Sequence, residues 1–519
     1  MDNTTRTHQT TSSRTKITQS MSPIRDEQFG YQQARHLLAR AGFGGTDEQI
    51  RTLAQWGPKK SVDHLMNFDS IPFQADAADA FDSDIMKPLT REERMTVNRA
   101  RQTGDEDTIA KYRTERQRRQ RADRRQMRDV QRSWLTRMVQ TPRPLEEKLT
   151  LFWHGHFATS FRIVEDSYHM YEQNRMLRSH CLGNFADLLR GIIKDPAMLK
   201  YLNNNQNRKD SPNENLGREL LELFSLGEGN YSEQDIKEAA RSLTGFTFDD
   251  NDFNFNARQH DNGNKTVLGI TGNMDGDDLV EAILRQQACA VFICHKLYRF
   301  FVRDVPMDLS QVDSAGRKAI AQLAQIMQQS NYELKPVMQR LLLSRHFYDP
   351  NIMGNKIKSP SELLIGSVRS LKVPVRDIGV VSDAMELMGQ SLYTPPSVKG
   401  WDGGRSWINT ATMFVRQNTL VYLLTGALPT KPVAFKDQQH FDAVSLIPSL
   451  NQAADANPSD EQIVRELAGI TIGEPDERTV NSVLRGSLGG LGQDATMQDP
   501  QAAVQALVLL TSLPEYQLC

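Results

Sequence analysis

Cysteine, aromatic side chains and long apolar runs are all scarce in this sequence of 519 residues. The four cysteines are scattered, and aromatic residues make up 7% of the chain. Disulfide frameworks are typical of short secreted chains, so at this length we expect buried, reduced thiols. The cysteines are Cys181, Cys289, Cys294 and Cys519, and the spacing of five between the middle two is not a zinc-ribbon pattern.

Apolar runs are too short for a membrane span or a secretory signal. No stretch approaches the roughly 18 consecutive apolar residues that a transmembrane helix needs. Residues 1–20 are rich in Thr, Ser and Gln and lack the apolar core of a signal peptide. We therefore predict a disordered tail over residues 1–27 and a cytoplasmic protein. Met21 is an alternative start, because patterned sequence begins just after it.

Charge of one sign is also missing, since the formal net charge is only -2 at pH 7. The whole chain therefore has no field that would attract nucleic acid or an anionic membrane. Basic residues gather only in a predicted charged helical arm at residues 90–138, where Arg91 to Arg132 holds 14 Lys/Arg against 8 Asp/Glu. A long solvated helix with internal ion pairs is the ordinary interpretation, and a surface for nucleic acid or an acidic partner is the alternative.

Apolar residues recur at helical spacing through most of the chain, which predicts a mainly α fold, a multi-helix globular bundle. Capping boxes at Thr46 and Ser232 mark two helix starts. Alternating phenylalanines predict a small β-hairpin excursion around residues 246–269. We divide the chain into the tail, a main helical domain at 28–428 that includes the arm, and a C-terminal helical extension with polar linkers at 429–519.

Two histidines beside a glycine form the first candidate site, in Trp153-His154-Gly155-His156. On a continuous helix they point about 200° apart, but a helix end broken at Gly155 lets them converge on one metal ion. Glu165, Asp166 and His169 follow at helical spacing and offer further ligands. The alternatives are packed or capping histidines and a polar first helical turn.

Carboxylates and amides form a second cluster, on the predicted helix from Asn213 to Leu226. Glu219 and Glu222 are three apart and both reach one ion, whereas a ladder of surface ion pairs is the alternative. The amide-rich loop before the helix suits either polar ligand recognition or a hydrogen-bonded turn network. The residues assigned to substrate binding or to clamping an anion are Asn213, Asn215 and Arg218.

A third cluster surrounds a tight Asn-Gly turn. His260 and Asp261 are adjacent and together suit an acid/base and its orienting group. Lys265 follows as a substrate-binding residue for an anion. An ordinary hairpin turn explains the same residues, so both interpretations stay open.

Several of these segments together resemble a known family. They are, in order, residues 34–44, 152–157, 213–227 and 238–246, followed by His260-Asp261, Lys358-Ser359-Pro360 and Pro395 to Trp401. The ordered set, spread over Gln28 to Leu424, is similar to the bacterial family named domain of unknown function 1800. That resemblance implies a largely helical protein without an assigned reaction. Many members look exported, and this chain departs from them by showing no evident signal peptide.

Three functional hypotheses follow from the sequence. The leading one is a metal-assisted enzyme of the hydrolase class, with a divalent metal on His154, His156, Glu219 and Glu222. Its catalytic residues are His260, Asp261 and Arg218. The rival is a non-catalytic scaffold or binding protein, with a small-molecule or protein partner, in which the polar clusters only fix helix packing. Nucleic-acid binding through the arm is the weakest of the three.

Overall fold

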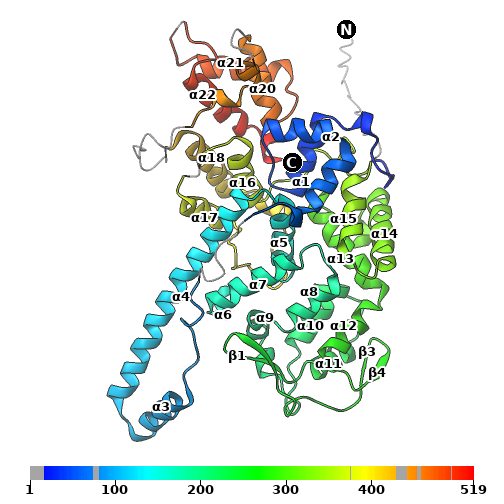
Figure 1. Ribbon diagram of the computed structural model, residues 1–519, viewed down its shortest axis with the longest axis vertical. Coiled ribbons are helices and arrows are strands. Elements are labelled where there is room, and N and C mark those ends of the chain that lie inside the picture. Colours follow the sequence, from blue (N-terminus) through cyan, green and yellow to red (C-terminus); the bar gives the residue numbers. More distant parts are fainter. Residues whose placement is uncertain (1–16, 74–80, 375, 428–440, 453–457, 493) are drawn as a thin grey trace, which may run out of the picture.

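The computed structural model describes residues 17–73, 81–374, 376–427, 441–452, 458–492 and 494–519, and most of them are helical (Figure 1). The helices of the first half are α1 (Tyr31–Ala41), α2 (Asp47–Met66), α3 (Arg91–Thr103), α4 (Glu106–Gln140), α5 (Pro144–His156), α6 (Phe161–Val164), α7 (Ser167–Ser179), α8 (Phe185–Ile192), α9 (Pro196–Tyr201), α10 (Asn215–Leu221) and α11 (Glu233–Ser242). The helices of the second half are α12 (Gly276–Leu284), α13 (Gln287–Phe301), α14 (Ser314–Gln329), α15 (Leu334–Leu343), α16 (Pro360–Ser370), α17 (Ile378–Leu387), α18 (Thr410–Thr425), α19 (Pro448–Gln452), α20 (Asp460–Thr471), α21 (Glu477–Leu488) and α22 (Pro500–Ser512). The predicted mainly α fold is confirmed.

Local capping chemistry sets the helix starts. The Thr46 hydroxyl accepts a hydrogen bond from the Gln49 N–H, and the Gln49 side chain accepts one from the Thr46 N–H, as the capping box predicts. Ser232 and Asp235 do the same at the start of α11. These bonds satisfy backbone N–H groups that the first helical turn leaves without partners.

Two small antiparallel sheets interrupt the helices in the described part of the chain. Strands β1 (Phe246–Asp249) and β2 (Asp252–Phe255) pair with Phe246 opposite Phe255, which confirms the hairpin predicted from alternating phenylalanines. Strands β3 (Lys265–Val267) and β4 (Ile270–Gly272) form the second hairpin. Both hairpins lie at the end of the body away from α20 to α22 (Figure 1).

The centre of the body is α5, in which every residue except Gly155 is buried. A buried ion cluster ties it to α16, because the Lys148 Nζ lies 2.6 Å from a Glu362 oxygen and the Lys356 Nζ lies 3.1 Å from the other. Burial would disfavour each charge alone, but together they compensate one another. Residues separated by 214 positions in the sequence are thereby fixed side by side.

The packed part of the chain begins closer to the N-terminus than the sequence predicts. Residues 1–16 lie outside the described residues, whereas Met21 and Ile24 are buried and the Ile24 N–H bonds the Leu343 carbonyl oxygen at 2.8 Å. A single-residue bridge pairs Pro23 with Ser344. The disordered tail predicted over 1–27 therefore does not extend through residues 17–27, since apolar side chains there join the core.

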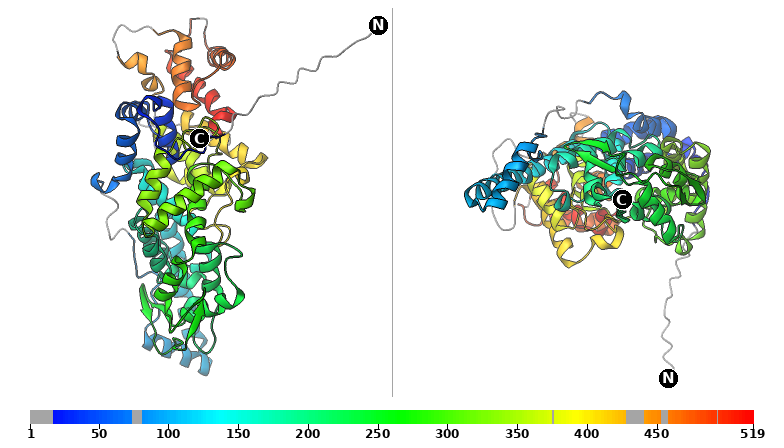
Figure 2. Two further views of the ribbon diagram at one scale, coloured as in Figure 1. Left: turned by 90° about the vertical axis from the view of Figure 1, so that its right-hand side faces the viewer. Right: turned by 90° about the horizontal axis from the view of Figure 1, so that it is seen from below.

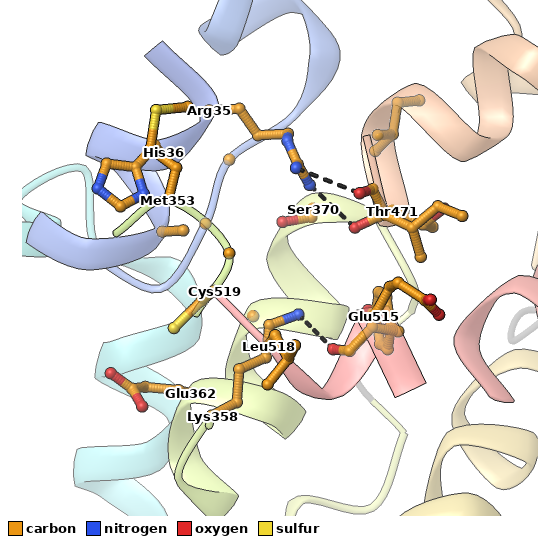
Figure 3. Close-up of a pocket in the computed structure, with 18 of the residues that line it drawn as sticks. Arg35, His36, Met353, Lys358, Glu362, Ser370, Thr471, Glu515, Leu518 and Cys519 are labelled. Carbon is orange, nitrogen blue, oxygen red and sulfur yellow. Dashed lines mark hydrogen bonds between the residues drawn. The ribbon is translucent and has the colours of Figure 1, made fainter. Parts of the chain in front are cut away.

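The last described residues are built into the same body. The Lys358 N–H bonds the Gln517 carbonyl oxygen at 2.8 Å, and its Nζ reaches the Tyr516 carbonyl oxygen at the same distance. Arg35 of α1 donates to the carbonyl oxygens of Thr471 and Ile472 at 3.0 and 3.4 Å (Figure 3). Residues placed in a C-terminal extension by the sequence thus pack directly on α1 and α16.

The charged segment is a helical hairpin that projects from the body (Figure 1 and the right view of Figure 2). We expected one long helix over residues 90–138, but Gly104 ends α3 in the left-handed region, at φ 68°, and α4 runs back. Glycine adopts this conformation at little cost, so the turn forms there. Among the helices described, none is long and apolar enough to span a bilayer.

Candidate functional site

The two histidines of the central motif face different surroundings, because α5 continues through Gly155 to His156. The His154 Nε2 accepts the Tyr393 N–H at 3.0 Å, so its proton sits on Nδ1. The His156 Nε2 lies 3.0 Å from the Phe224 carbonyl oxygen, which fixes the opposite tautomer. Burial lowers the pKa of His154 to about 3 and that of His156 well below its usual value, so both rings are neutral at pH 7.

The four predicted metal ligands do not form one group in the described part of the chain. Glu219 is half-buried, and burial followed by the Glu222 charge raises its pKa, while Glu222 itself accepts the Tyr231 hydroxyl at 2.5 Å. Among the described residues, no group of three or more His, Cys, Asp or Glu side chains is placed to hold a metal ion. The continuous helix is the physical reason, since it directs His154 and His156 to different sides of α5.

The other offered ligands have structural partners. Asp166 caps α7 by accepting the N–H groups of Tyr168 and His169, both at 3.1 Å. The His169 Nε2 lies 3.0 Å from the Asp250 carbonyl oxygen, and Glu165 is the left-handed residue that ends α6. This segment therefore shapes a loop, as the alternative of a polar helix start predicts.

The side chains of the cluster at the second hairpin bond one another and the nearby backbone, and we call this set the paired cluster (Arg241, Thr244, His260, Asp261 and Lys265). Asp261 does not orient His260, because its carboxylate accepts the Arg241 Nε at 2.7 Å and the Gly263 N–H at 2.8 Å. The Arg241 bond lowers the pKa of Asp261 to about 2. The His260 Nδ1 lies 2.8 Å from the Thr244 carbonyl oxygen.

Lys265 and Arg218, which we expected to contact an anion, also have protein partners. The Lys265 Nζ is buried and donates to the carbonyl oxygens of Asp261 and Met274 at 2.5 and 2.8 Å. Arg218 pairs with Glu214 and Glu233, each at 3.1 Å. Both side chains therefore have protein partners in the described structure.

The amide-rich loop is a hydrogen-bonded turn network. Asn207 donates to Asn204 at 3.0 Å and to the Ala240 carbonyl oxygen at 2.8 Å, and it accepts the Asn213 N–H at 2.9 Å. Asn213 in turn accepts the Asn215 N–H at 3.0 Å. Asn215 itself is exposed at the start of α10. Of the two interpretations of these amides, this geometry favours the structural one.

A different group of residues surrounds a hollow of about 770 Å³ beside α13, which we call the α13 hollow. A smaller lobe of about 120 Å³ shares six lining residues with it. The residues of the hollow that matter most here are His156, Glu222, Phe292, Lys296, Arg299 and Trp401. Of the predicted site residues, the structure brings His156 and Glu222 together here.

Lys296 and Arg299, three apart on α13, face the hollow without an acidic partner. Four carboxylates also line it, those of Glu222, Glu228, Asp308 and Asp402. Within the described residues, however, none of them forms an ion pair with either cation, and the Lys296 Nζ lies over the Phe292 ring, 5.8 Å from its centroid. Burial and then the Arg299 charge lower the pKa of Lys296 to about 8. Arg299 donates to the Asp402 carbonyl oxygen at 2.5 Å.

Two glycines bring the rims of the hollow together. Gly400 has φ 78°, and a Cβ on it would lie 2.2 Å from the Gly155 carbonyl oxygen. A Cβ on Gly155 would lie 3.6 Å from the Trp401 ring. The end of α5 and the loop before α18 therefore pack backbone to backbone. Trp401, held in this way, has a buried indole N–H without a partner in the described structure.

The opposite rim is irregular where it meets His156. We expected one helix from Asn213 to Leu226, but α10 widens into a π-helix at Glu222–Leu226, which ends at Gly227 with φ 82°. The Ser225 hydroxyl bonds the Leu220 carbonyl oxygen at 2.6 Å within this turn. Phe224, in the π-helix, supplies the carbonyl oxygen that fixes the His156 tautomer. Single π turns are frequent at functional sites.

Three basic residues that line the hollow were not among the predicted site residues: Lys296, Arg299 and Lys399. The first two lie in the apolar run Ala288 to Phe301, where apolar neighbours surround them in the sequence. The signal available was a basic pair three apart on one helical face. Segments 152–157, 213–227 and 395–401, on which the family resemblance rests, all contribute residues to the α13 hollow.

Comparison with known proteins agrees with that resemblance. The family model described as "Protein of unknown function (DUF1800)" matches residues 36–518. The match extends beyond the segments recognised in the sequence and includes the predicted C-terminal extension. No curated protein and no solved structure gives a match. The chain therefore belongs to the DUF1800 family of proteins of unknown function.

Proposed function

We propose that this protein binds a small organic molecule through a carboxylate or phosphate group in the α13 hollow. The observation that carries the proposal is the pair of cations, Lys296 and Arg299, that face the hollow with no ion-paired carboxylate in the described structure. A partly buried ammonium group loses hydration, and an anionic ligand would restore the favourable interaction.

Hydrogen bonding and shape support the same proposal. Trp401 lines the hollow together with both cations, and its buried indole N–H has no acceptor among the described residues. Indole is a donor only, so a ligand oxygen is its natural partner. Phe292, Leu223 and Val291 supply an apolar wall suited to the carbon skeleton of a ligand. A volume of about 770 Å³ is within the range of small-molecule sites.

His156 adds a neutral acceptor to the rim. Its Nε2 carries the proton towards Phe224, and its buried Nδ1 has no partner in the described structure. A ligand hydroxyl or protonated group is the partner that such a nitrogen would accept from. These features support recognition, and they assign no bond-breaking step.

The metal-assisted hydrolase of the sequence analysis stays a hypothesis with a direct test. Its four ligands are not gathered in the described structure, so binding alone is the function proposed. Metal analysis of untagged protein, compared with His154→Ala/His156→Ala, decides between the two. A stoichiometric metal that the double variant loses would restore the enzymatic hypothesis. The cytoplasmic location likewise stays a prediction.

The binding test uses succinate, citrate and phosphoserine, with succinamide as the uncharged control, in calorimetric titrations. We expect at least one anion to bind wild type, succinamide not to bind, and Lys296→Met to weaken the binding tenfold or more. Trp401→Phe keeps the ring and removes the N–H, so we expect a smaller loss. Lys237→Met, on the exposed side of α11, is the matched control and should bind as wild type does. Equal binding by Lys296→Met and wild type would refute the proposal.

A further inference from the structure

The projecting hairpin separates an apolar side of α4 from a basic one. Met127, Val130 and Trp134 are buried and share one side of the helix. Positions 118, 121, 125 and 128 are spaced three and four apart and lie on the opposite side, at about 100° per residue. They carry exposed arginines, and we call this set the arginine face (Arg118, Arg121, Arg125 and Arg128).

Acidic residues of the hairpin are removed from the arginine face by the fold. Asp123 is 2% exposed and accepts the Ser167 N–H at 2.7 Å. Glu93 and Asp105 are occupied at the N-terminal ends of α3 and α4, where they bond Thr90 and Thr108. These three acids are therefore held away from the arginine face, whereas Glu115 and Asp129 of α4 remain beside it.

Most arginines of the arginine face have no acidic partner in the described structure. Arg118 has an exposed ion pair with Glu115 at 3.7 Å. Within the described residues, Arg121, Arg125 and Arg128 form no ion pair, and neighbouring Arg124 is also exposed without one. Asp129 is exposed beside Arg128 in the sequence, and it pairs with Arg132 at 3.9 Å. A row of free guanidinium groups on a rigid helix is complementary to a row of phosphates.

We propose that the arginine face docks on the phosphate backbone of double-stranded DNA. This inference is independent of the α13 hollow. From Arg118 to Arg128 the helix rises about 15 Å, at 1.5 Å per residue, and a DNA strand carries a charge about every 3.4 Å of its axis. Several phosphates are thus within reach of one face of α4.

Other polyanions fit this surface less well. Membrane-bound helices insert apolar side chains, and protein interfaces have an apolar core, whereas the arginine face has neither. Single-stranded nucleic acid is recognised by aromatic stacking, and Tyr112 is the one aromatic residue of α4 before Trp134, which is buried. Double-stranded RNA is recognised through its 2′-hydroxyl groups together with its phosphates, and a face made only of arginines offers no acceptor for the hydroxyl protons. Duplex DNA needs only the charge and the exposed helix that α4 provides.

The test is fluorescence anisotropy of a mixed-sequence 30-base-pair DNA duplex titrated with the full chain at 50 to 200 mM KCl. We expect binding that weakens steeply with salt. The variant Arg118→Gln/Arg121→Gln/Arg125→Gln/Arg128→Gln should bind at least tenfold more weakly at 100 mM KCl. Its plot of log affinity against log salt should be shallower by about 3 to 4, because each lost phosphate contact removes about 0.9.

A control variant of equal charge change separates a specific face from general charge. Exposed arginines on other elements serve this purpose, and the set is Arg258→Gln/Arg285→Gln/Arg345→Gln/Arg478→Gln. It should keep wild-type affinity, and circular dichroism should show both variants folded. Absence of duplex binding at 50 mM KCl, or an equal loss in both variants, would overturn the proposal. Tighter binding to polyglutamate, to an RNA duplex or to anionic vesicles than to DNA would overturn it as well.

Discussion

The α13 hollow and the paired cluster contain similar residue types but differ in how their polar groups are bonded. In the paired cluster the Lys265 ammonium donates to two carbonyl oxygens, and Asp261 is held by Arg241. In the α13 hollow the Lys296 ammonium has neither kind of partner among the described residues. Both lysines are withdrawn from water, yet only one is compensated by its neighbours.

This difference separates residues that stabilise the fold from residues free to bind a ligand. A buried polar group with a complete set of partners contributes to stability and has no bond left to offer. A group that lacks them carries a cost that a ligand removes. The comparison therefore predicts opposite results for the same substitution in the two places.

The largest effect should come from forcing apart the two backbone segments whose close contact shapes the hollow. Gly400→Ala places a Cβ 2.2 Å from the Gly155 carbonyl oxygen, in a left-handed residue, and should lower the free energy of unfolding by more than about 3 kcal/mol. Gly403→Ala is the matched control, because Gly403 has φ 76° and no atom within 4 Å of a Cβ. We expect about 1 kcal/mol there. Equal losses in urea unfolding would contradict the close packing of the two segments.

The next effect tests the comparison directly. Lys265→Met leaves two buried carbonyl oxygens without their donor and should cost about 2–3 kcal/mol. Lys296→Met removes an uncompensated charge of similar size and should leave stability unchanged or raise it slightly. Urea unfolding of both variants at pH 7 measures the difference. A loss for Lys296→Met as large as that for Lys265→Met would remove the distinction between the two regions.

The stability of the wild type relative to Lys296→Met should depend on pH. The pKa of Lys296 is lowered from 10.5 to about 8, so between these values the unfolded chain binds more protons than the folded one. Stability contributed at this position therefore rises as pH increases from 8 to 10.5, on the order of 1 kcal/mol. We expect the wild type to gain this much relative to Lys296→Met in urea unfolding. A constant difference between pH 7 and pH 10 would contradict the lowered pKa.

The smallest effect lies in the paired cluster. The Arg241 hydrogen bond lowers the pKa of Asp261 to about 2, so its contribution is present above pH 4 and lost as pH falls from 4 to 2. Asp261→Asn should cost about 1 kcal/mol at pH 7 and nothing near pH 2. Thermal unfolding at both pH values measures this. A difference that persists at pH 2 would show that the carboxylate acts by shape rather than charge.

Much of the fold could be predicted from local residues. Capping pairs such as Thr46 with Gln49 act within one helical turn, and the alternation from Phe246 to Phe255 acts within one hairpin. Gly104 was harder to interpret, because a glycine inside a helical pattern costs only about 1 kcal/mol and the sequence does not show whether the helix continues. The body is therefore predictable, and the bend of the arm less so.

The site could be predicted only in part, because the hydrogen-bond and ion-pair partners of each side chain decide whether it can bind a ligand. His260 and Asp261 are adjacent in sequence, yet the carboxylate turns to Arg241, twenty positions earlier. Lys296 appears in the sequence as one cation in an apolar helix, and its lack of an acidic partner depends on where residues 222–228 and 398–402 lie. Such long-range geometry has no local signature. His156 was predicted because its motif is compact.

The seam that joins α1 and α16 to residues 471–472 and 514–519 has a consequence for synthesis. Lys358 and Arg35 find their carbonyl partners only in these late segments. A ribosome that makes the chain from its N-terminus exposes α1 and α16 long before those partners exist. This part of the core would thus close only after residues 471 to 519 have been made, and nascent chains stalled before residue 471 should be far more sensitive to protease than chains that include these residues.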